Sequence, residues 1–206
     1  MVDSVRTKIS RRSFLSGTGA VTVGAATLEA ALAGVKETMA EAVGTEIVGP
    51  GPTTVALRVN GVTQALSVEP RTTLAEALRG TLGLTGAKIG CDRGACSACT
   101  VLLDGTPIAS CSILAVDVGE RRITTVEGLA RDGKLHPVQA AFIEHDALQC
   151  GFCTPGLVLS CVALLERNPN PTEAEVKDAV SGHICRCGAY PHVIEAALAA
   201  AEAGRG

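Results

Sequence analysis

Cysteine is the residue type through which this chain could do chemistry. The sequence has nine cysteines among 206 residues, and all nine lie between Cys91 and Cys187. Thiolates bind iron and zinc, and thiols form disulfides in oxidising compartments. By their spacing, eight of the nine fall into two sets of four, which predicts two separate sites.

The first set has the spacing C-x4-C-x2-C-x11-C and consists of Cys91, Cys96, Cys99 and Cys111. A C-x4-C-x2-C run with a distant fourth cysteine is typical of plant-type [2Fe-2S] ferredoxins. Small residues such as Gly94 and Ala95 let a loop curl around a cluster and point its amides at the sulfurs. Structural zinc sites more often pair two C-x2-C knuckles. The loop therefore favours an iron–sulfur cluster over its alternatives, zinc or disulfides.

The second set has the spacing C-x2-C and then C-x-C, and consists of Cys150, Cys153, Cys185 and Cys187. The first pair directly precedes a predicted helix, and the second pair falls between the last two predicted helices. Helix N-terminal amides favour a negatively charged cluster. The spacing alone suits a [2Fe-2S] cluster and leaves zinc open.

The ninth cysteine, Cys161, lies in the middle of an apolar predicted helix. A thiol in that position is typical of a buried structural residue rather than of a ligand. Disulfides would suit an exported chain. The odd cysteine count, the two tight loops and a core large enough to fold unaided all count against them.

The first cysteine set is expected in a small α+β domain at residues 53–127. Asn60-Gly61 and Asp104-Gly105 each separate two short alternating segments, which is a strong hairpin signal. Thr73 and Glu76 form a capping box before a short helix. The predicted elements are strands at 54–60 and 62–68, a helix at 74–82, strands at 100–103 and 107–110, and a strand at 123–126.

The second cysteine set is expected in an all-α domain at residues 128–206. Helical periodicity, a capping box at Thr172 with Glu175, and the Thr154-Pro155 start signal carry this prediction. The expected helices span 137–145, 155–167, 172–181 and 191–202, which predicts a small four-helix bundle.

Residues 1–45 read as a twin-arginine export signal and linker. Arg11-Arg12 precedes a moderately apolar stretch at 17–33, and small-residue cleavage sites end at Ala33 and, as the second choice, at Ala42. Glu29 and several Thr and Gly residues make that stretch a poor membrane span, so no stable membrane insertion is expected. Because this route carries folded proteins, a cofactor inserted in the cytoplasm is compatible with the periplasmic location that the signal predicts.

Composition excludes other classes of function. With 47% hydrophobic residues the chain is globular rather than disordered, and its net charge is −3, from 18 basic and 21 acidic residues. No basic run outside the extreme N-terminus could follow a nucleic-acid backbone, and 2% aromatic residues provide no base-stacking platform. Nucleic acid is therefore not an expected partner.

Three motifs in order carry a family resemblance: GCDRGACSACTV at 90–101, QCGFCTPG at 149–156 and ICRCGAY at 184–190. Together they resemble the iron–sulfur subunit of the xanthine oxidase family of molybdenum hydroxylases, and with the export signal they are most similar to that of periplasmic aldehyde oxidoreductases. The resemblance implies a β-grasp ferredoxin-like domain followed by a four-helix domain, each with one [2Fe-2S] cluster. Ser97 departs from the family, because many members have glycine there.

The resemblance also implies a role and partners. Such subunits pass electrons from a molybdenum cofactor on a large subunit towards FAD on a medium subunit, which implies a heterotrimer. Gln149 and the loop of Cys187 are implied to lie beside the molybdenum pterin, and the amide of Gln149 suits a pterin edge. No residue of this chain is expected to be catalytic, because the substrate site belongs to the large subunit.

The expected function is therefore electron transfer in a periplasmic, molybdenum-dependent aldehyde oxidoreductase. One alternative is the same subunit in an enzyme that hydroxylates N-heterocycles of the isoquinoline, purine or nicotine type. Another is a free-standing ferredoxin-like carrier or a secreted cysteine-rich binding module. The helical domain argues against a lone ferredoxin, since a simple carrier needs one cluster.

The remaining polar candidates favour structural roles. The four histidines lie near predicted helix ends and are expected at the surface or as caps: His136, His145, His183 and His192. Arg186 lies between two predicted ligands. Its charge would stabilise a reduced cluster, or it would be solvated or paired with another subunit.

Overall fold

The computed structural model describes residues 48–204. The predicted export signal at 1–45 lies outside the described residues. From Gly49 onward the chain groups into a single compact unit, so the two cysteine sets belong to one body.

The first hairpin forms where the sequence predicts it. Strands β1 (Thr53–Val59) and β2 (Val62–Val68) pair in antiparallel register. Asn60 and Gly61 connect them with positive φ angles of 50° and 84°, the left-handed conformations that a two-residue turn requires. The ends of both strands bury alternate side chains, such as Leu57 and Leu66, against the core.

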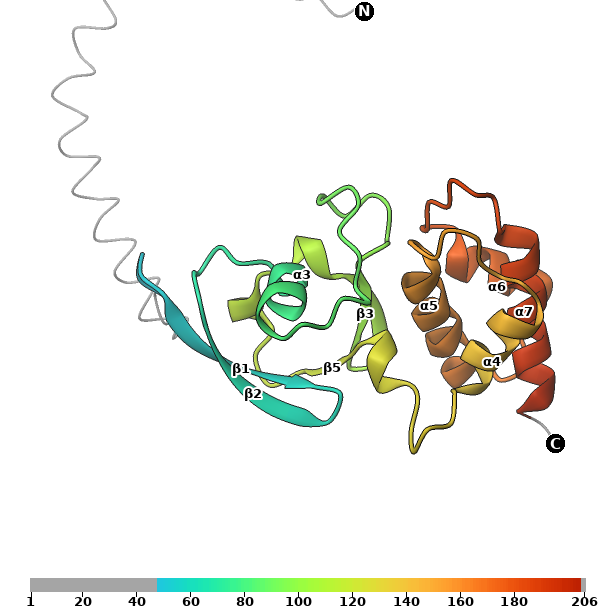
Figure 1. The fold of residues 1–206 in the computed structure, drawn as a ribbon, viewed down its shortest axis with the longest axis horizontal. Helices are drawn as coiled ribbons and strands as arrows, with labels where there is room; N and C mark the ends of the chain where they lie inside the picture. Colours follow the sequence, from blue (N-terminus) through green and yellow to red (C-terminus); the bar gives the residue numbers. More distant parts are fainter. Residues whose placement is uncertain (1–47, 205–206) are drawn as a thin grey trace, which may run out of the picture. The chain divides into compact units, whose positions relative to one another are not determined.

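The other strands complete a five-stranded mixed sheet in the order β2-β1-β5-β3-β4. Strands β3 (Thr100–Leu103) and β4 (Thr106–Ala109) form the second predicted hairpin. Strand β5 (Arg122–Thr124) lies between them and the first hairpin, parallel to β1 and antiparallel to β3. The fold is therefore α+β, as predicted (Figure 1).

Strand β5 is shorter than the predicted strand at 123–126. The Thr125 amide donates to Asn60 Oδ1 at 2.9 Å instead of to a neighbouring strand. The chain then turns into a 3-10 helix at Val126–Gly128. A side chain 65 residues away thus ends the strand, which short-range patterning does not reveal.

The predicted helix after Thr73 has two parts. Its capping box is present, and α3 (Leu74–Glu76) continues directly into a π-helical turn, η2 (Ala77–Thr81). The buried Leu74 and Leu78 pack into the core beneath the sheet. Two 3-10 turns, η3 (Ser110–Ser112) and η4 (Ala115–Asp117), lead from β4 towards β5.

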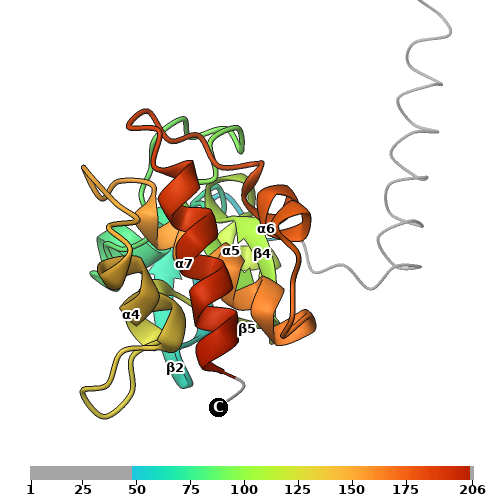
Figure 2. The same cartoon turned by 90° about the vertical axis from the view of Figure 1, so that its right-hand side faces the viewer.

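The C-terminal part contains the four predicted helices: α4 (Pro137–Glu144), α5 (Thr154–Arg167), α6 (Glu173–Val180) and α7 (Tyr190–Ala203). In Figure 2, α7 lies in front, with α4 and α6 on either side of it. The predicted capping box of Thr172 is formed, and His136 caps α4.

Helix α5 joins the helices to the sheet. Nine consecutive residues of this helix, from Gly156 to Leu164, are buried, because it contacts β3 and β4 as well as the other helices. Leu102 of β3 belongs to the same apolar core as α5. In the part of the chain that the structure describes, no helix is long and apolar enough to span a membrane.

Candidate metal centres

The loop at 91–99 curls as the sequence predicts. Asp92, Gly94 and Ser97 all have positive φ angles, between 54° and 71°. This curl turns two consecutive amides towards sulfur: Gly94 N–H donates to Cys111 Sγ and Ala95 N–H to Cys91 Sγ, both at 3.2 Å. Amide donors of this kind stabilise thiolates and a negatively charged cluster.

The four thiols of the first set interact in two pairs. Cys91 interacts with Cys96, and Cys99 with Cys111. The Arg93 amide, supported by the Cys96 thiol, lowers the pKa of Cys91 to about 7. Burial raises the pKa of Cys99. Because iron binds the thiolate, the lowered pKa of Cys91 favours ligation, whereas the raised pKa of Cys99 opposes it until metal displaces the proton.

The second set gathers at the N-terminal ends of two helices. Cys153 is the N-cap residue of α5, and Cys185 and Cys187 directly precede α7. These thiols also form two pairs, because Cys150 interacts with Cys187 and Cys153 with Cys185. The C-x2-C segment and the C-x-C segment therefore meet in space as predicted, although more than thirty residues of sequence separate them.

Helix-end amides counteract burial at this second set. The Phe152 amide and the Cys187 thiol lower the pKa of Cys150. Burial acts to raise the pKa of Cys185, but the Ala189 amide and the Cys153 thiol outweigh it and the pKa falls. Burial raises the pKa of Cys153 to about 12. Negative charge at this site is thus stabilised by amides of the loops that directly precede α5 and α7.

This pairwise arrangement suits a cluster with two irons, each of which takes two thiolates. Within residues 48–204, no group of three or more His, Cys, Asp or Glu side chains lies close enough together to hold a single metal ion. All nine cysteines, which lie in this range, are free thiols rather than disulfides. Cys161 is fully buried, as predicted, and burial raises its pKa to about 12.

The two cysteine loops contact each other. Ile184 N–H, next to Cys185, donates to the carbonyl of Cys96 at 3.2 Å. Phe152 packs against Gly90, since a Cβ on that glycine would lie 3.4 Å from Phe152 Cε1 and 3.2 Å from Cys96 Sγ. Sequence reasoning missed both contacts. Phe152, an exposed aromatic residue between two ligand cysteines, was the available signal.

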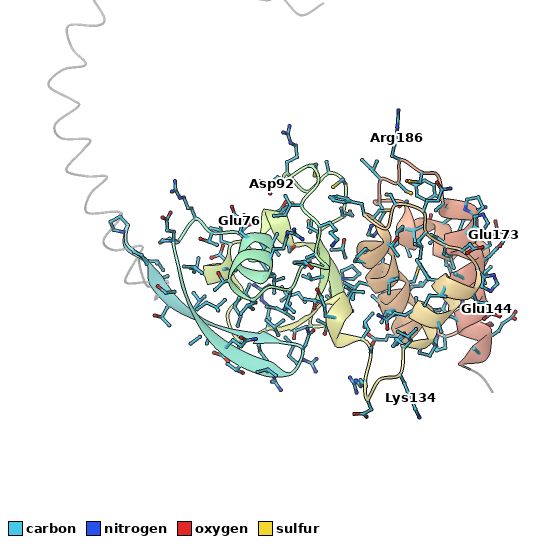
Figure 3. All side chains as sticks on the ribbon, in the orientation of Figure 1. Glu76, Asp92, Lys134, Glu144, Glu173 and Arg186 are labelled. Atoms are coloured by element: carbon cyan, nitrogen blue, oxygen red, sulfur yellow. The ribbon has the colours of Figure 1, made fainter. Side chains whose placement is uncertain are left out.

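An apolar and polar rim surrounds the second set. The side chains of Leu148, Phe152 and Ile184 are large and exposed, and Ile184 is 62% exposed. Gln149 is exposed beside Cys150. Figure 3 shows Arg186 pointing away from the fold, on the same edge of the ribbon as the loop that carries Asp92. Arg186 is therefore placed to meet solvent or a partner.

One histidine departs from expectation. His183 is not a surface residue: it is 4% exposed, and its Nε2 lies 2.7 Å from Ser160 Oγ of α5. Its Nδ1 is buried without a hydrogen-bond partner among the described residues, and burial lowers the pKa of His183 to about 4. His136 does cap α4, and the His192 ring contacts the His145 carbonyl. The exposed Ser181 and Gly182 directly before His183 conceal its burial in the sequence.

Comparison with known families agrees with this geometry. Residues 57–130 match the 2Fe-2S iron-sulfur cluster binding domain family, and residues 125–198 match the [2Fe-2S] binding domain family. The crystal structure of quinoline 2-oxidoreductase from Pseudomonas putida 86 aligns with a TM-score of 0.72 and 46% identity. That alignment covers 75% of this chain and 96% of the solved chain.

Two relatives are subunits of larger enzymes. The nicotine 6-hydroxylase small subunit of Paenarthrobacter nicotinovorans is 50% identical over 142 residues, covering 69% of this chain and 86% of the relative. The aldehyde oxidoreductase iron-sulfur-binding subunit PaoA of Escherichia coli O157:H7 is 43% identical over 191 residues, covering 85% and 83%. This chain therefore belongs to the iron–sulfur subunits of the xanthine oxidase family of molybdenum hydroxylases, and it binds two [2Fe-2S] clusters.

Proposed function

We propose that this chain is the electron-transfer subunit of a periplasmic, molybdenum-dependent aldehyde oxidoreductase. One observation carries the choice of enzyme. The similarity to PaoA covers 85% of the chain, more than the described residues make up, so it extends into the N-terminal segment. The export prediction rests separately on Arg11-Arg12, further towards the N-terminus. The nicotine 6-hydroxylase subunit is similar over 69% of the chain.

The eight paired cysteines are the proposed ligands. Cys91, Cys96, Cys99 and Cys111 hold one cluster within residues 53–127, and Cys150, Cys153, Cys185 and Cys187 hold the other within 128–206. Each cluster supplies a site that accepts and releases one electron. The residues of this chain fix the thiolates, donate amide hydrogen bonds to them and keep part of each site away from water.

Two partner subunits complete the proposed complex: a large one with the molybdenum cofactor and a medium one with FAD. The rim of Leu148, Phe152 and Ile184 is the proposed seat of the large subunit. Exposed apolar side chains around a charged site are typical of a surface that a partner covers. Gln149 lies at this rim and has an amide that can donate to and accept from a pterin edge.

A second candidate is an N-heterocycle hydroxylase. It is favoured by the higher identity to the nicotine 6-hydroxylase small subunit, 50% against 43% for PaoA. Substrate contacts would lie on the large subunit, so both candidates assign the same role to this chain.

The complete complex, purified with its partners, distinguishes the candidates. We expect an aromatic aldehyde to bleach the iron–sulfur absorbance rapidly under anaerobic conditions, and nicotine, quinoline or a purine to leave it unchanged. The opposite pattern would select the second candidate.

The double variant Arg11→Lys with Arg12→Lys tests the export signal. It is expected to keep the complex in the cytoplasmic fraction, and appearance of this variant complex in the periplasm would contradict the export signal.

A further inference from the structure

We propose that the hydroxyl group of Tyr190 is a positioning element that links the two cysteine sets and thereby promotes electron passage between the two clusters. The inference rests on the electron-transfer role proposed above. It concerns residues between the two sites, and it does not depend on the substrate or on the location of the enzyme.

A continuous run of hydrogen bonds joins a ligand segment of one set to a ligand segment of the other. Cys185 N–H donates to Tyr190 Oη at 2.8 Å, and this hydroxyl donates to the carbonyl of His183 at 2.7 Å. That carbonyl belongs to the same peptide group as the Ile184 N–H, which donates to the Cys96 carbonyl at 3.2 Å. The relay therefore runs from Cys185 through one hydroxyl and one peptide group to Cys96.

The Tyr190 hydroxyl acts in the relay as donor and acceptor at once. A tyrosine hydroxyl has one hydrogen to donate, and here it goes to His183 while the oxygen accepts from Cys185. Linked hydrogen bonds of this kind polarise and strengthen one another. Removal of the hydroxyl therefore breaks two adjacent bonds and loosens the peptide that reaches Cys96.

The surroundings hold the relay in place from the other side. The buried His183 ring contacts Ser160 Oγ of α5. A Cβ added to Gly156, also on α5, would lie 2.6 Å from the Ser97 carbonyl and 3.0 Å from His183 Cε1. Helix α5, the segment 183–185 and the first cysteine loop thus meet at one close contact, where glycine alone fits.

The hydroxyl holds the direct route between the two sets in place. From Cys185 that route runs along the backbone to the Ile184 N–H and across its hydrogen bond to the Cys96 carbonyl, and the two bonds of the Tyr190 hydroxyl fix the peptide group that makes this contact. One electron leaves the reduced centre and enters the oxidised one, while no proton moves and no covalent bond forms or breaks. The residues of the relay are neither oxidised nor reduced, so they need no further reactant.

The test compares Tyr190→Phe with Ser181→Ala in the assembled complex, reduced with dithionite so that no substrate is needed. Ser181→Ala is the matched control, since it removes a hydroxyl that donates to a backbone carbonyl of the same segment, Asp178 O at 2.8 Å, outside the relay. In Tyr190→Phe we expect amide hydrogen exchange at 183–187 to accelerate at least about fivefold, since two hydrogen bonds are lost and a net loss of about 1 kcal/mol already gives that factor. We also expect weaker magnetic interaction between the two reduced clusters in electron paramagnetic resonance. The control should show neither change.

Faster exchange with an unchanged magnetic interaction would assign Tyr190 a purely structural role and overturn the proposal. If Tyr190→Phe fails to assemble, Ser160→Ala removes the anchor of His183 instead and should weaken the interaction in the same direction; an unchanged interaction there would also overturn it. If the unaltered complex lacks two cluster signals in electron paramagnetic resonance, the proposed electron-transfer function fails. Failure of that function is therefore distinguishable from failure of the proposed role of Tyr190.

Discussion

Among individual residues, the contrast between two cysteines of α5 shows how position decides chemistry. Cys153 caps the helix and interacts with Cys185, whereas Cys161 lies two turns further along and contacts apolar core residues. We expect Cys153→Ala to remove the cluster of the second set. Cys161→Ala should keep both clusters and lose about 1 kcal/mol of stability from the small cavity. Iron analysis and electron paramagnetic resonance check the pair, and loss of iron from Cys161→Ala would refute the ligand assignment.

His183 makes stability depend on pH. Burial lowers its pKa to about 4, against 6.5 for an exposed histidine, so between these values the unfolded chain binds a proton that the folded chain does not. This contribution to stability is complete above pH 6.5 and is lost as the pH falls towards 4, by about 3 kcal/mol in total. His183→Gln, which cannot titrate, should show a shallower fall of the melting temperature between pH 7 and 5. Equal slopes for both proteins would contradict the prediction.

At the scale of the elements, local sequence patterns predicted the hairpins and helices, and they missed the features that depend on residues far away in the sequence. Asn60-Gly61, Asp104-Gly105 and the capping box at Thr172 each act within a few residues, and the hairpins and helices formed as predicted. The cysteine spacing likewise predicted two sets of four. The early end of β5 at Thr124 depends on Asn60, which no local pattern contains.

The same reason explains what was missed at the site. The burial of His183 depends on Ser160, 23 residues away, and the link between the cysteine loops depends on Cys96 and Ile184, which are 88 positions apart. The π-helical turn after Glu76 also escaped prediction. The apolar spacing of residues 74–82 predicts a helix. It does not distinguish an α-helical hydrogen bond, which reaches the fourth preceding residue, from a π-helical one, which reaches the fifth.

The contact between α5 and the first cysteine loop tests how tightly the elements fit. A Cβ at Gly156 would lie 2.6 Å from the Ser97 carbonyl. Alanine favours a helix over glycine by about 1 kcal/mol, but forcing extra volume into a packed contact costs about 1–3 kcal/mol. We expect Gly156→Ala to lower the melting temperature and Gly182→Ala, whose Cβ would lie 3.5 Å from Ser97 Oγ, to leave it nearly unchanged. Equal stability of the two variants would show that the contact is loose.

For the whole molecule, Gln149 tests where the molybdenum subunit docks. Gln149 is exposed and directly precedes Cys150, and its side chain is not one of the proposed ligands. We expect Gln149→Ala to leave both clusters assembled while molybdenum cofactor is lost from the complex or electron flow into the clusters slows. Metal analysis and anaerobic rapid mixing measure the two effects. A variant with full cofactor content and unaltered flow would place the docking surface elsewhere.

The order of the two clusters can be tested on the complete complex. If the second set faces the molybdenum cofactor, the first set lies further out, towards FAD. Cys96→Ala removes one thiol of the Cys91 and Cys96 pair but keeps the backbone carbonyl that Ile184 contacts. It should therefore abolish the first cluster and spare the second.

In rapid mixing of the Cys96→Ala complex with substrate, we expect the remaining cluster to be reduced at the normal rate and FAD to stay oxidised, because the outer step of the route is missing. Cys153→Ala is the matched variant on the inner side, and it should block reduction of both the remaining cluster and FAD. If the order is reversed, Cys96→Ala should block reduction of both the remaining cluster and FAD, while Cys153→Ala should leave its remaining cluster reducible and FAD oxidised. The two variants together decide the direction, since each removes one thiol from a different set and neither alters the residues of the proposed docking surface.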